Sequence, residues 1–150
     1  MGGNIIGSIR SAAQRWRKRL LRSTAEHLRR GASGERLASR YLRRQGFKIL
    51  YRNFRGRTGG EIDIVCRDRD TLVFVEVTTR SREDFGRPAE AVGREQQRRI
   101  SRGALAWLRM LDNPDILFRF DIVEVVLAEG AEPRLELIRD AFPLAESYIY

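Results

Sequence analysis

Two carboxylates on neighbouring apolar segments are the residues best placed to do chemistry. Asp63 lies in Glu61-Ile-Asp-Ile-Val65, and Glu76 lies in the β-branched run Thr71–Thr79, so both segments are predicted to be strands. A two-residue turn at Arg69-Asp70 would pair Asp63 directly with Glu76, with Cβ atoms roughly 5 Å apart. Like charges this close destabilise a sheet unless something neutralises them, so we expect a divalent metal ion between them.

A metal ion held by two carboxylates suits the hydrolysis of phosphodiesters. Mg²⁺ binds one or two carboxylates together with waters and substrate phosphate oxygens, and it polarises the phosphate. The chain has 29 Lys and Arg against 20 Asp and Glu, a formal net charge of +9, which favours an anionic partner such as nucleic acid or an acidic membrane face. The alternative is an exposed sheet edge on which Glu61, Asp63, Glu76 and Arg80 form solvated ion pairs.

The composition excludes several other site classes. Cys66 is the only cysteine and His27 the only histidine, which rules out an internal disulfide framework, a multi-thiolate metal site and a paired-histidine zinc site. No apolar run approaches the ~20 residues that a membrane-spanning helix needs. We therefore expect a cytoplasmic protein.

The 150 residues divide into an N-terminal basic helical extension, 1–30, and one α/β domain, 31–150. In the extension, apolar residues recur at helical spacing between arginines, which predicts a basic amphipathic helix. Three uses stay open for it: a loosely packed appendage, an arm that binds nucleic acid or a partner protein, and a helix that contacts a membrane surface.

The α/β domain is predicted to begin with a helix, followed by three strands, a second helix and one or two further strands. The first helix would be capped by Ser33, after the break at Gly31-Ala-Ser-Gly34, and would end at Gly46. The first three strands should be antiparallel, and the long second helix should cross back to a strand of the same sheet. The predicted ranges are helices 35–45 and 89–111 and strands 47–51, 61–65, 71–79, 118–127 and 134–138.

Alternation along the two central strands assigns their side chains to faces. On the strand 61–65, Glu61 and Asp63 share one face and Ile62 and Ile64 the other. On the next strand, one face is predicted to carry Leu72, Phe74, Glu76, Thr78 and Arg80. A slip of one residue in the pairing would separate the two carboxylates onto opposite faces.

Arginines gather near the predicted site. The candidates for contact with a nucleic-acid backbone are Arg52, Arg55, Arg57, Arg80, Arg98 and Arg99, although solvated surface is an equally good use of arginines on a helix. Tyr51 and Phe54 could stack on an unpaired base, but packing is the favoured interpretation for both. We interpret Cys66 as structural and Asp121 as a charge on an edge strand.

Several motifs occur in an order that resembles the YraN-like family of small bacterial proteins, within the PD-(D/E)XK nuclease superfamily and near the Holliday-junction resolvases. The motifs are Gly34-Glu35, Arg52-Asn-Phe-Arg55, Gly60-Glu-Ile-Asp-Ile64, Leu72-Val-Phe-Val-Glu-Val77, Pro88-Ala-Glu-Ala91 and Arg119-Phe-Asp-Ile-Val123. The resemblance runs from about Gly34 to Ile138. It implies a restriction-endonuclease-like core, a central mixed sheet in the order αβββαβ flanked by helices. It also implies Mg²⁺ or Mn²⁺ as cofactor, DNA as partner, and a homodimer as one arrangement suited to branched DNA.

The resemblance also assigns roles at the site. Asp63 would be the central metal ligand, Glu76 the second, and the carbonyl oxygen of Val77 a third. Glu35 would be an outer acidic residue that helps to orient a metal-bound water, although a carboxylate near a helix N-terminus also has an ordinary role against the helix dipole. Arg80 matches the arginine that follows this strand in the family.

One departure from the superfamily pattern bears on catalysis. The position two residues after Glu76 usually carries lysine, and here it is Thr78, which has no charge and no useful acidity. Losing one such preorganised group costs on the order of 10²–10³ in rate. Arg80 could supply charge, Gln96 could position the water, and Lys48 on the neighbouring strand could take over the role of the lysine.

Three functions follow. The first is a Mg²⁺-dependent endonuclease, a hydrolase that acts on DNA phosphodiesters and is selective for DNA structure. The second is a catalytically weak or inactive nucleic-acid-binding module of the same fold, which the threonine at position 78 favours. The third is an interaction protein that docks residues 1–30 on a partner or an acidic membrane.

Overall fold

The computed structural model describes residues 14, 15, 17, 18, 29, 31–81 and 92–146, and the chain separates into the units Met1–Ser33 and Gly34–Tyr150. In the first unit, residues 14, 15, 17 and 18 are helical; the rest of the predicted extension, except 29, lies outside the described residues. The motif at 88–91 lies outside them as well. All elements below belong to the second unit, apart from the first residues of its leading helix.

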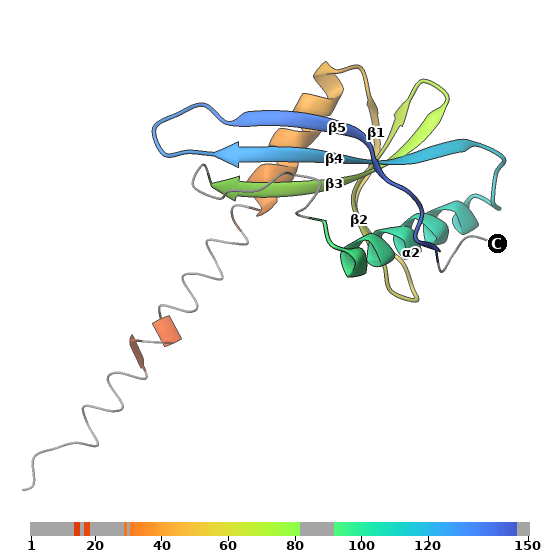
Figure 1. Cartoon of the computed structure of the whole chain (residues 1–150), viewed down its shortest axis with the longest axis horizontal. Helices are drawn as coiled ribbons and strands as arrows, with labels where there is room; N and C mark the ends of the chain where they lie inside the picture. The colour runs from red at the N-terminus through yellow and green to blue at the C-terminus, as the bar shows by residue number, and fades with distance from the viewer. Residues whose placement is uncertain (1–13, 16, 19–28, 30, 82–91, 147–150) are drawn as a thin grey trace, which may run out of the picture. The chain divides into compact units, whose positions relative to one another are not determined.

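Five strands form one mixed sheet in the order β1-β2-β3-β4-β5 (Figure 1). β3 and β4 are parallel, and the other neighbours are antiparallel. The strands are β1 (Lys48–Arg55), β2 (Glu61–Asp68), β3 (Thr71–Ser81), β4 (Leu117–Leu127) and β5 (Arg134–Phe142). Helix α2 (Arg94–Met110) makes the crossover between β3 and β4. The predicted α/β core, with antiparallel strands first and a helical return to the same sheet, is therefore confirmed.

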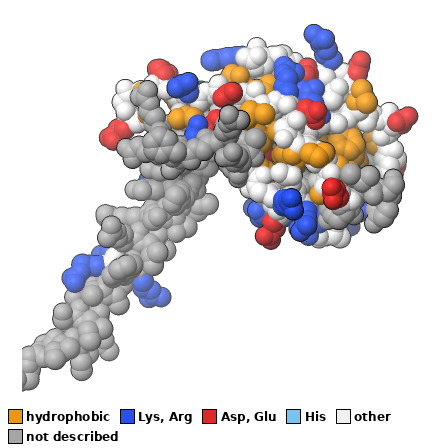
Figure 2. Space-filling model, viewed as in Figure 1, with side chains coloured by type: hydrophobic (Ala, Val, Ile, Leu, Met, Phe, Trp, Pro, Cys, Tyr) orange, Lys and Arg blue, Asp and Glu red, His pale blue; other side chains and the backbone are white. Residues whose placement is uncertain are grey.

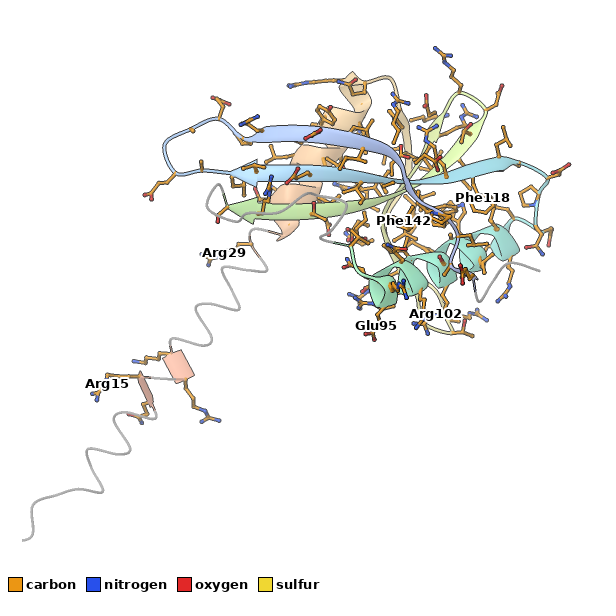
Figure 3. All side chains as sticks on the ribbon, in the orientation of Figure 1. Arg15, Arg29, Glu95, Arg102, Phe118 and Phe142 are labelled. Atoms are coloured by element: carbon orange, nitrogen blue, oxygen red, sulfur yellow. The ribbon has the colours of Figure 1, made fainter. Side chains whose placement is uncertain are left out.

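Each face of the sheet is covered by one helix, because β3 is apolar on both faces. Leu72 and Phe74 join the core beneath α2, whereas Val73 and Val75 join the core beneath a helix over residues 31–44. The sequence of a strand that is buried on both faces is a nearly continuous apolar run, as the sequence of β3 is from Leu72 to Val75. Figure 3 shows the ring of Phe142 between the sheet and α2. The two cores hold β2 and β3 rigidly where the carboxylates emerge.

The first helix differs from the prediction at its start and agrees at its end. Gly31-Ala-Ser-Gly34 is helical, so the predicted break and the Ser33 cap are wrong. Gly34 is there for packing: a Cβ on it would collide with the side chain of Thr79 on β3. The helix ends as predicted, since Gly46 has φ 92° and the N–H of Phe47 donates to the carbonyl of Leu42 at 3.0 Å.

Helix α2 begins later than predicted. Its N-cap is Gly93 in an extended conformation (φ −71°, ψ 169°), and the Gly93 carbonyl accepts the N–H of Gln97 at 3.0 Å. Val92, predicted to lie within the helix, is buried in the core just before it, and the predicted residues 89–91 lie outside those described. Among the described residues, no helix combines the length and apolarity that crossing a membrane requires.

Candidate active site

The β2–β3 hairpin has the predicted register. Its pairs run from Asp68↔Thr71, closed by Arg69-Asp70, to Ile64↔Val75. The ladder stops there, one step before Asp63 would pair with Glu76. Beyond that step, the N–H of Val77 donates to Oδ2 of Asp63 at 2.8 Å. The side chain of Asp63 therefore takes the place of a ladder carbonyl and is held against β3.

The predicted alternation along β2 is wrong at Ile62. Ile62 packs beneath α2, where a Cβ on Gly103 would lie 3.0 Å from its Cγ1, whereas Ile64 packs in the core on the opposite face. The partner strand bends at the same level: Asn53 has φ 55° and lies between the pairs that join β1 to Ile62 and Ile64. A residue in the left-handed region redirects a strand, and asparagine tolerates this conformation better than most residues. At residues 62–63, side chains therefore do not alternate between the two faces as they do in a regular strand.

Glu76 contacts both the other strand and α2. The side-chain amide of Gln96 donates to Oε1 of Glu76. Burial raises the pKa of Glu76 to about 8, and the negative charge of Asp63 adds to the effect. Burial also raises the pKa of Asp63, while the Val77 N–H lowers it in part. The hydrogen bond between the two side chains raises the pKa of Glu76 further and lowers that of Asp63.

Glu35 extends the carboxylate group from a third element, the helix over 31–44. Burial raises its pKa, and the negative charge of Asp63 raises it further; a hydrogen bond with Asn53 and the charge of Arg52 lower it. Because the helix already includes residue 31, Glu35 lies in its second turn, which weakens the helix-dipole interpretation. Sequence reasoning missed Asn53 as a partner, although it stands in the motif Arg52-Asn-Phe-Arg55.

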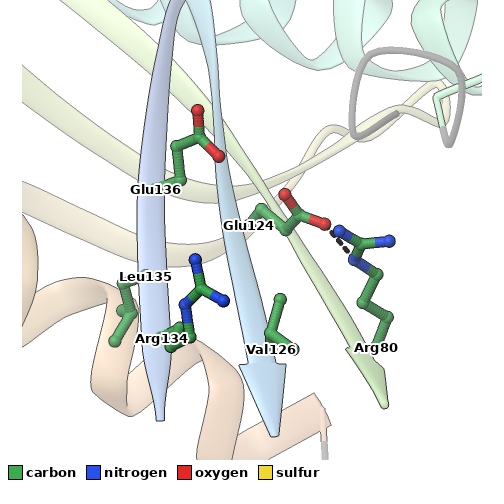
Figure 4. Close-up of a pocket in the computed structure, with 6 residues that line it drawn as sticks. All are labelled: Arg80, Glu124, Val126, Arg134, Leu135 and Glu136. Carbon is green, nitrogen blue, oxygen red and sulfur yellow. Dashed lines mark ion pairs between the residues drawn. The ribbon is translucent and has the colours of Figure 1, made fainter. Parts of the chain in front are cut away.

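Thr78 and Arg80 differ in what surrounds them. Among the described residues, Oγ1 of Thr78 is buried and has no hydrogen-bond partner. Arg80 forms an ion pair with Glu124, which is only 2% exposed (Figure 4). Thr78 pairs with Glu124 across the parallel strands, so the guanidinium of Arg80 reaches back toward the level of Thr78. Glu124 was missed by sequence reasoning; its only signal was a charge inside an apolar strand.

The remaining candidate residues are Lys48, Gln96 and the arginines. Lys48 pairs with Arg67, four positions along β2 from Asp63 and roughly 13 Å away, so it does not reach the carboxylates. Gln96 is engaged with Glu76. Figure 2 shows basic side chains spread over the visible face of the domain. The exposed candidates are Arg52, Arg55, Arg57, Arg98 and Arg99.

Asp121 is not a charge on an edge strand. β4 lies between β3 and β5, and Asp121 is fully buried. Nε of Arg119 donates to it at 2.9 Å, as does the N–H of Asp140. Arg119 also contacts Asp68 at 2.9 Å, and this hydrogen bond lowers the pKa of Asp68. The network is structural. Cys66 lies next to this network. Burial raises the pKa of its thiol to about 12, as expected of an unreactive cysteine.

The donor set fits a hard divalent cation that keeps part of its water shell. In the described part of the chain, no three His, Cys, Asp or Glu side chains gather closely enough to hold a metal ion alone. Two carboxylates and a backbone carbonyl match the incomplete protein shell of Mg²⁺, which takes its other ligands from water and phosphate. The raised pKa values of Asp63 and Glu76 show that their negative charge is poorly compensated, and a cation would supply that compensation.

The mixed sheet, its α2 crossover and the carboxylates on β2 and β3 define a restriction-endonuclease-like α/β domain. The chain belongs to the uncharacterised protein family UPF0102, whose family model matches residues 34–125, and this confirms the YraN-like resemblance. A UPF0102 protein of Geobacter sulfurreducens is 49% identical over 115 residues, 77% of this chain and 89% of the relative. Relatives from Trichlorobacter lovleyi and Rhodococcus opacus are 47% and 46% identical and are covered over 91% and 99% of their lengths.

Proposed function

We propose that this domain is a Mg²⁺- or Mn²⁺-dependent endonuclease that hydrolyses DNA phosphodiesters, with a preference for branched or single-stranded structures. The observation that carries the proposal is the hydrogen-bonded pair of Asp63 and Glu76 on two strands, with Glu35 on a third element close enough for the charge of Asp63 to raise its pKa. The pKa of each is raised by burial and by a neighbouring negative charge. Such crowding destabilises the fold and is typical of functional sites.

In this proposal, Asp63, Glu76 and the Val77 carbonyl would hold the cation. When bound, it would polarise a phosphate oxygen and make a water easier to deprotonate. The Val77 N–H fixes the carboxylate of Asp63, and the Gln96 amide fixes that of Glu76, so both ligands are oriented in advance. Glu35, anchored by Asn53, would hold the attacking water and accept its proton.

The exposed arginines on β1 and in the loop that follows it would hold the flanking phosphates. Arg52 carries its charge close to Glu35, as its effect on that pKa shows. Arg55 and Arg99 approach Glu61 at 3.9 Å and 3.4 Å, so their charges are partly compensated. Binding should therefore be salt-sensitive and independent of sequence.

The second candidate is a nucleic-acid-binding module without appreciable turnover. It is favoured by the surroundings of Thr78, which has no charge of its own, while the nearby guanidinium of Arg80 is paired with buried Glu124. A missing charge at the reacting phosphate would leave a rate on the order of 10²–10³ lower. Under this alternative, DNA binds and is not cut.

Cleavage of fluorescent branched and single-stranded DNA with Mg²⁺ or Mn²⁺ separates the two functions. The endonuclease predicts cutting by the wild type, loss with Asp63→Ala, and retention with Asp70→Ala, a control in the exposed β2–β3 turn. The binding module predicts DNA binding without cutting, and a gain of cleavage with Thr78→Lys. Equal cutting by the wild type and Asp63→Ala would end the endonuclease proposal.

A further inference from the structure

A β-bulge sets the direction of Tyr51. β1 pairs with β2 as Ile49↔Cys66 and then Tyr51↔Val65, so Leu50 is an extra residue in an edge strand. Without the bulge, Ile49 and Tyr51 would share a face. Instead, Ile49 packs in the core beneath the helix over 31–44, while Tyr51 lies on the α2 side. Bulges of this kind re-aim side chains and often lie next to functional sites.

The ring of Tyr51 packs against two other aromatic rings, and the residue remains half exposed. Its centroid lies 5.6 Å from that of Trp107 on α2 and 6.0 Å from that of Phe54. Phe54 and Trp107 contact each other edge to face at 5.2 Å, and Phe54 is only 6% exposed. Tyr51 is 50% exposed. The two aromatic candidates of β1 therefore differ: Phe54 is part of the core, whereas Tyr51 is held by two neighbouring rings and stays half exposed.

Basic residues lie near this ring along the chain. Arg55 and Arg57 follow Tyr51 at the end of β1 and in its loop, and both are exposed, whereas Arg52 lies near Glu35. Arg102 on α2 approaches the same loop, since a Cβ on Gly59 would lie 3.6 Å from its Nη1. An aromatic ring among arginines complements an anionic strand with exposed bases.

We propose that Tyr51, backed by Trp107, is a stacking platform for an unpaired base of a nucleic-acid strand. The proposal rests on the nucleic-acid partner of the proposed function and adds a structural preference to it. Gln96, which contacts Glu76, lies about three turns of α2 from Trp107, roughly 16 Å along the helix axis. A bound strand would thus be held by a base a few nucleotides from the carboxylates. Paired bases in a duplex are already stacked and would gain nothing.

The test measures binding by the full chain in EDTA, so that cleavage plays no part. The probes are a single-stranded oligonucleotide with one 2-aminopurine and a blunt duplex of the same length. Tyr51→Ala should weaken single-strand binding roughly 5- to 150-fold and abolish the quenching of 2-aminopurine. Tyr51→Phe should behave as the wild type, and duplex binding should change little. Leu117→Ala, which truncates another exposed apolar side chain, is the matched control.

A further variant separates stacking from folding. Tyr51→Leu keeps apolar volume against Trp107 but has no ring, so it should melt as the wild type does and still bind single strands weakly. Unchanged single-strand affinity in Tyr51→Ala or Tyr51→Leu, with salt-sensitive binding intact, would overturn the platform and leave the proposed function standing. If the wild type binds neither probe, the platform fails, and the cleavage assay with Mg²⁺ or Mn²⁺ alone decides the proposed function.

Discussion

Replacing Glu76 by glutamine should stabilise the metal-free protein at pH 8. Burial, followed by the charge of Asp63, raises the pKa of Glu76 from 4.5 to about 8. In the unfolded chain, this carboxyl group loses its proton near pH 4.5. Between these values the folded state binds more protons than the unfolded state, so the free energy of unfolding falls as pH rises. At 1.36 kcal/mol for each pH step, the loss by pH 8 is on the order of 4–5 kcal/mol.

Glutamine at position 76 keeps an oxygen that can accept the Gln96 amide, and it removes the charge. Urea denaturation in EDTA at pH 5, 6, 7 and 8 should therefore show a free energy of unfolding that falls by several kcal/mol in the wild type and much less in Glu76→Gln. Glu95→Gln, at an exposed acid in the first turn of α2, controls for the loss of one negative charge and should follow the wild type. Mg²⁺ should restore stability at pH 8 in the wild type alone. Parallel pH profiles for the wild type and Glu76→Gln would refute the reasoning.

Two further predictions concern the supports of the site. Gly34→Ala should lower the free energy of unfolding by about 1–3 kcal/mol, because its Cβ would collide with Thr79. Gly93→Ala, with open space around its Cβ, is the control in the same urea denaturation assay. Equal losses in the two variants would contradict the packing argument. Glu124→Gln should lower the free energy of unfolding by about 2 kcal/mol, because it removes the ion pair with Arg80, whose side chain is 33% exposed. The readouts are a lower urea midpoint and tighter DNA binding. Unchanged stability and unchanged DNA affinity would show that the ion pair contributes nothing.

The hairpin that carries the two carboxylates could be predicted because its determinants are local. A two-residue connection at Arg69-Asp70 and an apolar run on β3 determine the register, and one acceptable pairing remains. The end of the first helix is equally local, since Gly46 adopts a positive φ. The start of this helix could not be predicted locally. Gly34 is a glycine because a larger side chain would collide with Thr79, on a strand far along the chain, and not because the helix breaks there.

The site shows the same division. Asp63 and Glu76 could be predicted as a pair from strand geometry, and Glu35 came only with the family resemblance. The bend at Asn53, which breaks the alternation next to Asp63, has no signature in a period-two pattern. The ion pair that occupies Arg80 depends on which residue of β4 meets Thr78, and the length of the crossover leaves that register open. Charges inside apolar strands, such as Glu124, were the available signal.

The central claim is that the side chains of Asp63 and Glu76 converge on one divalent cation that a phosphate can reach. Anomalous diffraction from a crystal soaked in Mn²⁺ tests it most directly. We expect a single strong peak, bound by a carboxylate oxygen of each residue, that disappears in Asp63→Ala. Density for an ion held elsewhere, or none at the two carboxylates at millimolar Mn²⁺, would contradict it.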